Sequence, residues 1–342
     1  MKAIRVGQDR NLELCNVPEP AEPAAGYVTV RIAAAAINHG DKTFLKAPDA
    51  AGATRARSTR VHDVWGASAA GTVTAVGSGV PERYRGRKVA IYRGLQGDLP
   101  GVGTWSEIAQ LPHLTCLPLP DDVDERDYSG SLVNAATAYS FLEQALDEGH
   151  KGILATAGSS ATGRAMLALS RRRGVPLALL VRRAESKGEL IKLGATHVVS
   201  TEDEDFLLQL ERMSEELRTT AIFDGVGGAL IGRIMASLPA RSTFFFYGFL
   251  SGSEPVSFNS ALFMRKGTTM RRFSNFETAT VQDPKRLAAM LQDLESVIAD
   301  PLFRIQTGKE FGFADIEMAM AYDALRGPKP IFVPTAVSLK AT

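Results

Sequence analysis

The sequence has very few cysteines, since Cys15 and Cys116 are the only two among 342 residues. Two thiols cannot build a disulfide framework, and they cannot supply the four sulfur ligands of a structural zinc site. We therefore expect both to be unpaired core thiols in a protein of a reducing compartment.

An excess of charge and long apolar runs are also missing. Lysine and arginine together number 39 and aspartate and glutamate 38, so the net charge is +1 and nothing indicates a nucleic acid partner. The opening residues, MKAIRVGQDRNLEL, lack the apolar core of a signal peptide. No segment approaches the ~18 apolar residues that a membrane helix needs. These absences predict a cytoplasmic protein without a membrane partner.

The first third of the chain has the pattern of a β domain. Residues 1–125 are rich in Gly, Pro and Val, and helical spacing is scarce there. Short alternating runs at 27–37, 69–80 and 86–94 predict strands. We expect an antiparallel, barrel-like sheet over 1–125.

A different pattern begins near residue 126. Short apolar strands alternate with helices from "GILATAG" (152–158) to "TTMRRFSNF" (268–276). This alternation predicts a doubly wound parallel sheet over 126–276, the α/β architecture of nucleotide-binding domains. The remaining residues, 277–342, contain a strand–helix–strand pattern and are expected to return to the first domain.

The first strand-to-helix turn of that region, "TAGSSATGRAMLALSRRRG" (156–174), is close to a dinucleotide-binding fingerprint. The fingerprint is G-x-G-x-x-G between a strand and a helix, and here Ser160 replaces the middle glycine. Serine is small, its hydroxyl can bind a phosphate oxygen, and the helix start adds N–H groups and the positive dipole end. A helix start without a ligand is the alternative. The residues expected to bind the dinucleotide here are Gly158, Ser159, Ser160, Ala161, Thr162 and Gly163.

The charges after the second strand favour NADPH over NADH. Proteins that bind NAD usually place Asp or Glu about 20 residues beyond the glycines, against the ribose 2′-hydroxyl. Here Arg182 stands at that position, Arg183 follows it, and Lys187 opens the next helix. A guanidinium binds a 2′-phosphate with two hydrogen bonds, whereas a carboxylate would repel it. Solvated charge beyond a strand end is the alternative.

Segments along the whole chain resemble a known family in their order and spacing. They are "AAAAINHGD" (33–41), "WGASAAGTVTAVGSGV" (65–80), "GRKVA" (86–90), "GTWSEIA" (103–109), "VNAATAYSFL" (133–142), "LGATHVV" (193–199), "FDGVGG" (223–228) and "YGFLSG" (247–252). With the nucleotide loop, they resemble the medium-chain dehydrogenase/reductase superfamily, in its zinc-independent quinone oxidoreductase and enoyl reductase branches.

The resemblance implies a fold and an assembly. The expected domains are a GroES-like β-barrel catalytic domain (1–125), a Rossmann NADP-binding domain (126–276) and a C-terminal segment (277–342) that returns to the catalytic domain. Members of the family usually form homodimers or tetramers, with the active site between the domains. We expect a homodimer in which the strand at 242–249 pairs across the sheet edge.

The same resemblance argues against a metal. Zinc-dependent members carry Cys in the first motif, His-Glu in the second and a further Cys before "ATAYS". Here those positions are Asn38, Ala67-Ser68 and Val133. Apart from a weak amide oxygen, none of these is a zinc ligand. The expected chemistry is hydride transfer from NADPH, without metal, to a quinone or an α,β-unsaturated carbonyl whose oxygen takes up the negative charge.

Matching to the family motifs also implies site residues. Asn38 and Asp41 are expected beside the nicotinamide, Asn134 where the interdomain helix meets the cofactor, and Tyr92 as a proton donor. A turn role for Asn38 and a packing role for Tyr92 remain open. Further residues are expected to contact the cofactor: Thr137, Val226, Gly248, Phe249 and Ser251.

Two other functions remain open. One is an enoyl-thioester reductase, for which Arg55, Arg57 and Arg60 would hold a phosphate-bearing substrate. Such enzymes typically carry a proton-donating Tyr just after the first motif, and the stretch 41–63 contains none. The other is a cofactor-binding sensor or structural protein without turnover.

Overall fold

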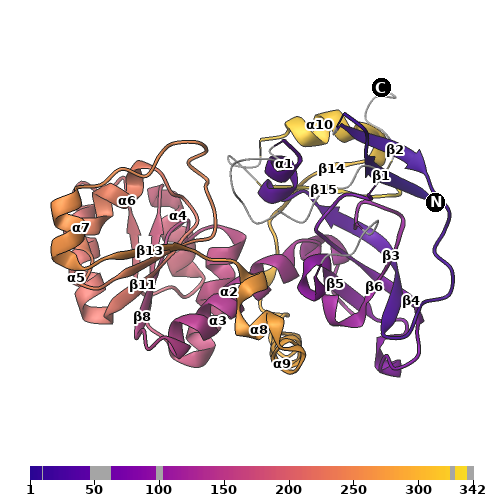
Figure 1. Cartoon of the computed structure of the whole chain (residues 1–342), viewed down its shortest axis with the longest axis horizontal. Coiled ribbons are helices and arrows are strands. Elements are labelled where there is room, and N and C mark those ends of the chain that lie inside the picture. Colours follow the sequence, from indigo (N-terminus) through magenta and orange to yellow (C-terminus); the bar gives the residue numbers. More distant parts are fainter. Residues whose placement is uncertain (10, 47–62, 98–102, 324–327, 337–342) are drawn as a thin grey trace. The chain divides into compact units, whose positions relative to one another are not determined.

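A computed structural model describes residues 1–9, 11–46, 63–97, 103–323 and 328–336 (Figure 1). The chain divides into two compact units, the first formed by Met1–Val133 with Leu287–Thr342 and the second by Asn134–Arg286. The boundaries expected from the sequence lay at 126 and 277. In the structure, each boundary between the two compact units lies several residues later, inside a helix. The two helices are α2 (Ser131–Asp147) and α9 (Pro284–Glu295).

The first unit is built on antiparallel strands. Its larger sheet has the order β14-β15-β3-β4-β5-β7, with β6 also paired to β3, and a separate hairpin joins β1 to β2. The strands predicted at 27–37, 69–80 and 86–94 are confirmed as β3, β4 and β5. The strands are β1 (Lys2–Val6), β2 (Leu12–Asn16), β3 (Tyr27–Ala36), β4 (Ser68–Val76), β5 (Lys88–Tyr92), β6 (Ile108–Pro112), β7 (Cys116–Pro118), β14 (Thr307–Phe311) and β15 (Lys329–Phe332).

The end of the chain completes this sheet. Strand β15 runs antiparallel to β3, with Ile331 opposite Ala36 and Phe332 opposite Ala35. The Phe332 ring packs edge-on against the fully buried Trp105, with ring centroids 4.9 Å apart. The helices of this unit include α1 (His39–Lys46) and α10 (Ile316–Ala321). The C-terminal segment therefore contributes both a strand and a core aromatic to the sheet of the N-terminal residues.

The two cysteines lie in this unit, and neither forms a disulfide. Cys116 is fully buried, as expected. Cys15 differs from the expectation, because it is only half-buried on β2, a strand of the small hairpin whose side chains are mostly exposed.

The second unit contains the parallel sheet that the sequence predicts. Six strands follow the order β10-β9-β8-β11-β12-β13, and every pairing is parallel. This is the doubly wound 3-2-1-4-5-6 order, in which ligands bind at the carboxyl ends of the strands. The strands are β8 (Gly152–Ala155), β9 (Leu177–Val181), β10 (Val198–Ser200), β11 (Thr219–Asp224), β12 (Thr243–Phe246) and β13 (Thr269–Arg272).

Helices connect these strands. Their apolar faces, among them those of α5 and α6, pack on the sheet through buried residues such as Leu210, Ile231 and Ile234. Within the ranges given above, no helix is long and apolar enough to cross a membrane. Beyond α2 and α9, the helices are α3 (Ala161–Arg173), α4 (Ala184–Lys192), α5 (Phe206–Leu217), α6 (Ala229–Ile234), α7 (Ser260–Lys266) and α8 (Ala279–Gln282).

Residues 242–249 were expected to pair across a dimer at the edge of the sheet. For β12, the strand within this range, that expectation is wrong. Strand β12 already pairs on both sides, with β11 and with β13, so its backbone N–H and C=O groups are used within the chain. The outer strand of this sheet is β13, which follows β12 in sequence and covers it. The family resemblance suggested this edge pairing, whereas a strand as apolar as "TFFF" is typical of a buried position.

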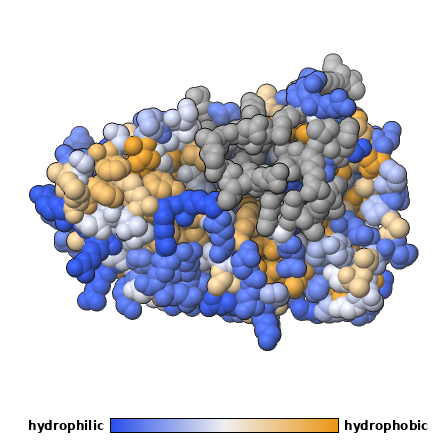
Figure 2. All heavy atoms as spheres, viewed as in Figure 1, coloured by the Kyte–Doolittle hydropathy of each residue, from blue (hydrophilic) through white to orange (hydrophobic). Residues whose placement is uncertain are grey.

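A patch of apolar surface lies over α6 and α7 (Figure 2). Exposed apolar side chains of this region include Val256, Phe258 and Met264, of which Met264 is 71% exposed. Contiguous exposed apolar surface is typical of interaction sites.

Candidate functional site

The turn between β8 and α3 is tightly wound. The Gly158 amide donates to the carbonyl of Leu180 on the neighbouring strand, at 3.0 Å. Ala157 has a left-handed backbone (φ 52°), and the Ser160 amide donates back to its carbonyl at 2.9 Å. A non-glycine residue at positive φ is strained, and such strain is concentrated at functional turns.

Helix α3 begins directly against this turn. A Cβ atom on Gly163 would lie 2.4 Å from the Gly158 carbonyl oxygen, so only glycine permits this approach. Helix α3 therefore packs closely on the turn, and the positive end of its dipole lies at this loop.

The Ser160 hydroxyl is used within the chain. It accepts a hydrogen bond from the Gly163 amide at 3.1 Å and so caps α3. It also hydrogen-bonds the Tyr247 hydroxyl, whose pKa is raised by burial and lowered in part by this bond. A direct bond from Ser160 to a phosphate stays a prediction, and it would compete with these partners.

Three aromatic rings stack near the carboxyl ends of β11 and β12. Tyr247, just beyond β12, stacks on Phe223 of β11 with centroids 3.9 Å apart, and Phe223 stacks on Phe141 of α2 at 4.0 Å. A Cβ on Gly225 would lie 2.6 Å from the Tyr247 oxygen, so glycine is required there too. The sequence analysis did not identify Tyr247 or Gly225, because their roles depend on strands that meet only in the fold.

Helix α2 is tied to the nucleotide loop by a side-chain hydrogen bond. The Thr162 hydroxyl donates to Asn134 Oδ1 at 3.0 Å, and both side chains are buried. Thr137 lies three residues further along α2 and is half-buried. The structure thus brings together Asn134 and Thr162, two residues that the sequence analysis named separately.

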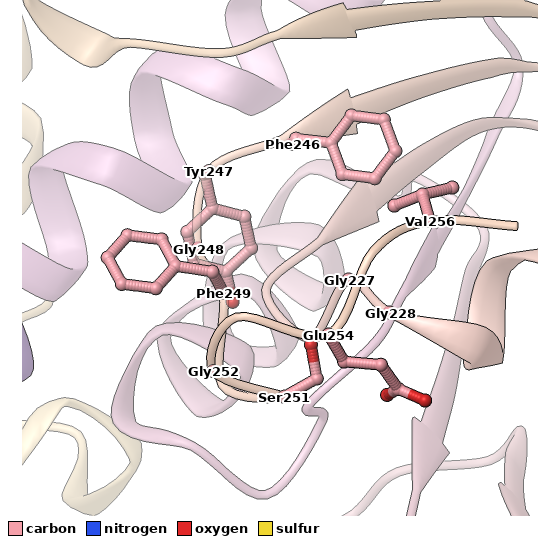
Figure 3. Close-up of a pocket in the computed structure, with 10 residues that line it drawn as sticks. All are labelled: Gly227, Gly228, Phe246, Tyr247, Gly248, Phe249, Ser251, Gly252, Glu254 and Val256. Atoms are coloured by element: carbon pink, nitrogen blue, oxygen red, sulfur yellow. The ribbon is translucent and has the colours of Figure 1, made fainter. Parts of the chain in front are cut away.

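The ends of β11 and β12 form a pocket of about 370 Å³ (Figure 3). The fully buried Asp224 holds one lining residue in place: it accepts hydrogen bonds from the Gly227 amide at 2.8 Å and from Thr156 Oγ1 at 2.5 Å. Burial raises the pKa of Asp224, against these hydrogen bonds. The Ser251 amide donates to the Val226 carbonyl at 2.9 Å. The lining residues are Gly227, Gly228, Phe246, Tyr247, Gly248, Phe249, Ser251, Gly252, Glu254 and Val256.

One polar atom in this pocket has no partner in the described part of the chain. The buried Ser251 Oγ makes no hydrogen bond there. A buried hydroxyl without a partner costs free energy, and a bound ligand with polar groups would satisfy it. The predicted residues Gly248, Phe249 and Ser251 all line the pocket, and Val226 lies beside it.

The basic residues beyond β9 are accompanied by acids that the sequence analysis missed. Arg182 and Arg183 are exposed, but Lys187 Nζ lies 2.7 Å from Asp203 Oδ2 and lowers the pKa of that carboxyl. Glu202 Oε2 accepts a hydrogen bond from the Ala184 amide, the first residue of α4, at 3.1 Å. Two carboxylates from the loop after β10 therefore lie in the predicted phosphate-binding region, one on Lys187 and one on the amide that follows Arg183.

In the first unit, Asn38 and Asp41 are joined in one polar cluster. Asp41, nearly fully buried, accepts from the Asn38 amide at 2.8 Å, from Asn38 Nδ2 at 2.9 Å and from the Ala67 amide at 3.1 Å. Asn38 Nδ2 also donates to Ser68 Oγ at 2.9 Å. Burial raises the pKa of Asp41, while these hydrogen bonds and the charge of Lys329 oppose the rise.

Two further residues belong to this cluster. Lys329 Nζ donates to Asn38 Oδ1 at 2.8 Å, and the sequence analysis missed it. Tyr92, at the end of β5, lies directly opposite Ser68 of β4 in the antiparallel register. Directly opposed residues point to the same face of a sheet, so the buried Tyr92 ring lies on the side of Ser68. Asn38, Asp41, Ser68, Tyr92 and Lys329 are called the Asn38 cluster below.

The remaining sequence predictions concern the zinc-ligand positions of relatives and the arginine cluster. Asn38 and Ser68, the positions of ligands in zinc-dependent relatives, are hydrogen-bonded to each other. Within the described ranges, no three His, Cys, Asp or Glu side chains are grouped as a metal site. The arginines 55, 57 and 60 lie outside the described residues.

Comparison with known proteins supports the assignment of the chain to a family. Residues 24–121 match the alcohol dehydrogenase GroES-like domain. Over 214 residues the chain is 28% identical to the rat (Rattus norvegicus) synaptic vesicle membrane protein VAT-1 homolog, covering 61% of this chain and 49% of that protein. Over 184 residues it is 25% identical to the mitochondrial enoyl-[acyl-carrier-protein] reductase of Candida glabrata, covering 50% and 48%. The chain thus spans about half the length of these curated relatives.

Solved structures share the whole fold. The Pseudomonas syringae quinone oxidoreductase is 22% identical, with a TM-score of 0.72 and coverage of 97% of this chain and 99% of that chain. The Escherichia coli quinone oxidoreductase complexed with NADPH is 20% identical, with a TM-score of 0.70 and coverage of 97% and 99%. At these identities the likeness concerns the fold.

The GroES-like sheet and the doubly wound parallel sheet define a two-part α/β fold with a Rossmann cofactor domain, as the sequence predicted. The chain resembles the medium-chain dehydrogenase/reductase superfamily, in its quinone oxidoreductase and enoyl reductase branches, through its GroES-like domain, its distant relatives and its fold. The resemblance seen in the sequence is confirmed at this level.

Proposed function

We propose that the protein is an NADPH-dependent, zinc-independent oxidoreductase that reduces a quinone or an α,β-unsaturated carbonyl. The observation that carries the proposal is the approach of α3 to the β8 turn, where Gly163 lies against the Gly158 carbonyl. An oxidoreductase of the medium-chain type is supported by the relatives, and solved NADPH complexes of the same fold support the cofactor.

The described residues fit NADPH along its length. At the start of α3, the amides of Ser159, Ala161 and Thr162 are offered to the pyrophosphate, because those of Ser160 and Gly163 are hydrogen-bonded within the turn. The exposed Arg182 and Arg183 are available for the 2′-phosphate, whereas Lys187 must leave Asp203 to reach it. At the other end, the pocket beside β12 offers the Ser251 hydroxyl to polar groups of the nicotinamide half.

When bound, NADPH supplies a hydride to the electron-poor carbon of the acceptor. The protein's own residues then hold the acceptor and meet the negative charge that develops on its oxygen. We assign the acceptor side to the Asn38 cluster, in which Asp41 and Ser68 fix the Asn38 amide. Asn134, held by Thr162, contributes from α2 on the cofactor side. Tyr92 or water supplies the proton.

The decisive experiment compares coenzyme affinities. Arg182→Asp is expected to weaken NADPH binding far more than NADH binding, measured by calorimetry on the full chain. Arg212→Asp on the exposed face of α5 is the matched control, because it makes the same charge change away from the loop. Equal losses for both coenzymes would remove the 2′-phosphate assignment, and no binding of either at millimolar concentration would overturn the proposal.

A second function, enoyl-thioester reduction, is favoured by the 25% identity to the Candida enoyl reductase. Turnover of NADPH with 1,4-benzoquinone, an enone and crotonyl-CoA separates the two, since a thioester reductase prefers the last. Tight NADPH binding without turnover of any acceptor would instead indicate a sensor or structural protein.

We also propose a cytoplasmic homodimer. The apolar surface over α6 and α7 supports association of two copies (Figure 2). Sedimentation velocity at micromolar concentration is expected to give a dimer, and a single monomer species would remove this part of the proposal.

A further inference from the structure

A lysine from the far end of the chain lies in the Asn38 cluster. The register of β15 on β3 pairs Ile331 with Ala36, and the Ile37 amide donates to the Pro330 carbonyl at 3.1 Å. Two residues before Ile331, the same antiparallel register brings Lys329 opposite Asn38. The ammonium donates to Asn38 Oδ1 at 2.8 Å, between residues 291 positions apart.

Hydrogen bonds within the cluster use both N–H donors and the oxygen of the Asn38 side chain. A side-chain amide has two N–H donors, and those of Asn38 are directed to Asp41 Oδ2 and to Ser68 Oγ. The atom that faces Lys329 must be the oxygen, because an ammonium group has donors only. Asn38 therefore cannot donate to an acceptor oxygen without giving up one of these bonds, and its amide orients the lysine instead.

The position of the ammonium is not explained by helix stability. A Cβ on Gly130 would lie 3.3 Å from Lys329 Nζ, and Gly130 directly precedes the first residue of α2. A cation at the N-terminus of a helix meets the positive end of its dipole, which is unfavourable. The lysine is half-buried there, so its charge has a use other than stabilising α2.

We propose that Lys329 is a catalytic residue whose ammonium stabilises the negative charge that forms on the acceptor oxygen. Asn38, fixed by Asp41 and Ser68, is the positioning residue that aims it. The proposal rests on the proposed function, and it assigns to Lys329 the role of the oxyanion-stabilising group that the sequence analysis did not identify.

The chemical step balances with this assignment. Hydride adds to the β-carbon of an enone, the π electrons of the C=C bond form the enolate, and its negative charge rests on oxygen beside the ammonium. A proton from water then reaches the α-carbon. For a quinone the same pair of electrons gives the hydroquinone monoanion, and water protonates its oxygen. In both cases the acceptor gains one hydride, which carries both electrons, and one proton, and NADPH becomes NADP⁺.

The test replaces the charge and keeps the length of the side chain. Lys329→Met is compared with Lys309→Met, an exposed lysine on the neighbouring strand β14. We expect kcat/KM for 1,4-benzoquinone to fall about a hundredfold in Lys329→Met, the effect of losing one oxyanion donor. The control is expected to retain wild-type activity, both variants are expected to bind NADPH like wild type, and Lys329→Arg is expected to recover part of the rate.

A second measurement does not depend on turnover. 4-Nitrophenol, an analogue of the hydroquinone monoanion, is titrated by absorbance with the protein and saturating NADP⁺. Wild type and Lys309→Met are expected to bind the phenolate form preferentially and to lower its apparent pKa, an effect that Lys329→Met loses.

The two proposals fail separately. If NADPH binds and Lys329→Met reduces benzoquinone as fast as wild type, or ionises nitrophenol equally, the lysine assignment is overturned and the proposed function stands. If wild type binds neither coenzyme, the proposed function fails and the assignment fails with it.

Discussion

The Thr162 hydroxyl donates a hydrogen bond to Asn134 Oδ1 over 3.0 Å, in a buried position. This bond joins the first turn of α3 to α2. Thr162→Val keeps the shape of the side chain and removes the donor, which is expected to lower the free energy of unfolding by about 1 kcal/mol. Urea unfolding measures this change. Thr162→Ser, which keeps the hydroxyl, should lose less, and a Thr162→Val protein as stable as wild type would contradict the role of the bond.

A second prediction concerns Gly163, which lies against the turn after β8. Gly163→Ala places a Cβ 2.4 Å from the Gly158 oxygen, so α3 must move away from the turn. Overpacking of this kind costs about 1–3 kcal/mol, and we expect NADPH affinity to fall by about tenfold or more. Calorimetry and thermal unfolding measure the two effects.

A matched control lies on the next helix. A Cβ on Gly188 of α4 meets no atom within 4 Å, so Gly188→Ala should stabilise the protein by roughly 0.5–1 kcal/mol and leave NADPH binding unchanged. Similar losses of affinity in both variants would show that the close approach at Gly163 has no special part in binding.

Glu202 should limit the preference for NADPH. Its carboxylate caps the start of α4 through the Ala184 amide, beside Arg182 and Arg183, where it repels a 2′-phosphate. Glu202→Gln keeps an acceptor and removes the charge. NADPH affinity is expected to rise about two- to fivefold at low salt, and the gain to shrink with added salt. NADH affinity, measured in parallel, should not change; an equal gain for NADH would contradict the explanation.

The thiols should differ in reactivity. Burial raises the pKa of Cys116 to about 12, whereas Cys15 is half-buried on β2. Ellman's reagent at pH 8 is therefore expected to count one thiol in the native protein and two after denaturation. Cys15→Ser should remove the fast thiol, and rapid reaction of both in the native state would contradict the burial of Cys116.

The Cys116 thiol makes the free energy of unfolding depend on pH. The unfolded chain ionises this thiol near its ordinary value of 9.0 and the folded protein only near 12, so the folded state holds the proton more tightly. Its contribution to stability is complete below pH 9 and is lost as the pH rises towards 12. Cys116→Ala should flatten this alkaline decline in urea unfolding, and an unchanged decline would assign it to other groups.

Local patterns predicted much of the fold. The alternation of apolar strands and helices after residue 126 identified the six parallel strands, because each element carries its own periodicity. The nucleotide loop was equally visible, since its glycines and the following helix lie within a few residues. The role of the Ser160 hydroxyl was not visible, because its partner Tyr247 lies 87 residues away and meets it only through the packing of β12.

Strand order was harder to predict. The run "TFFF" of β12 was expected at an edge, and β13 covers it. The polar residues of β13 fit an outer strand better than the phenylalanines of β12 do, but the order in a sheet also follows from how the connecting helices pack on its faces.

By itself the sequence determined where strands, helices and the glycine turn form, because these depend on side chains that are close along the chain. It also determined which polar residues could take part in a functional site. Only the tertiary structure decided that Lys329 meets Asn38 and that Glu202 meets the start of α4. Those pairs depend on strand register and on the order of strands in a sheet, which are set by the burial of distant apolar residues and leave no periodic pattern in the sequence.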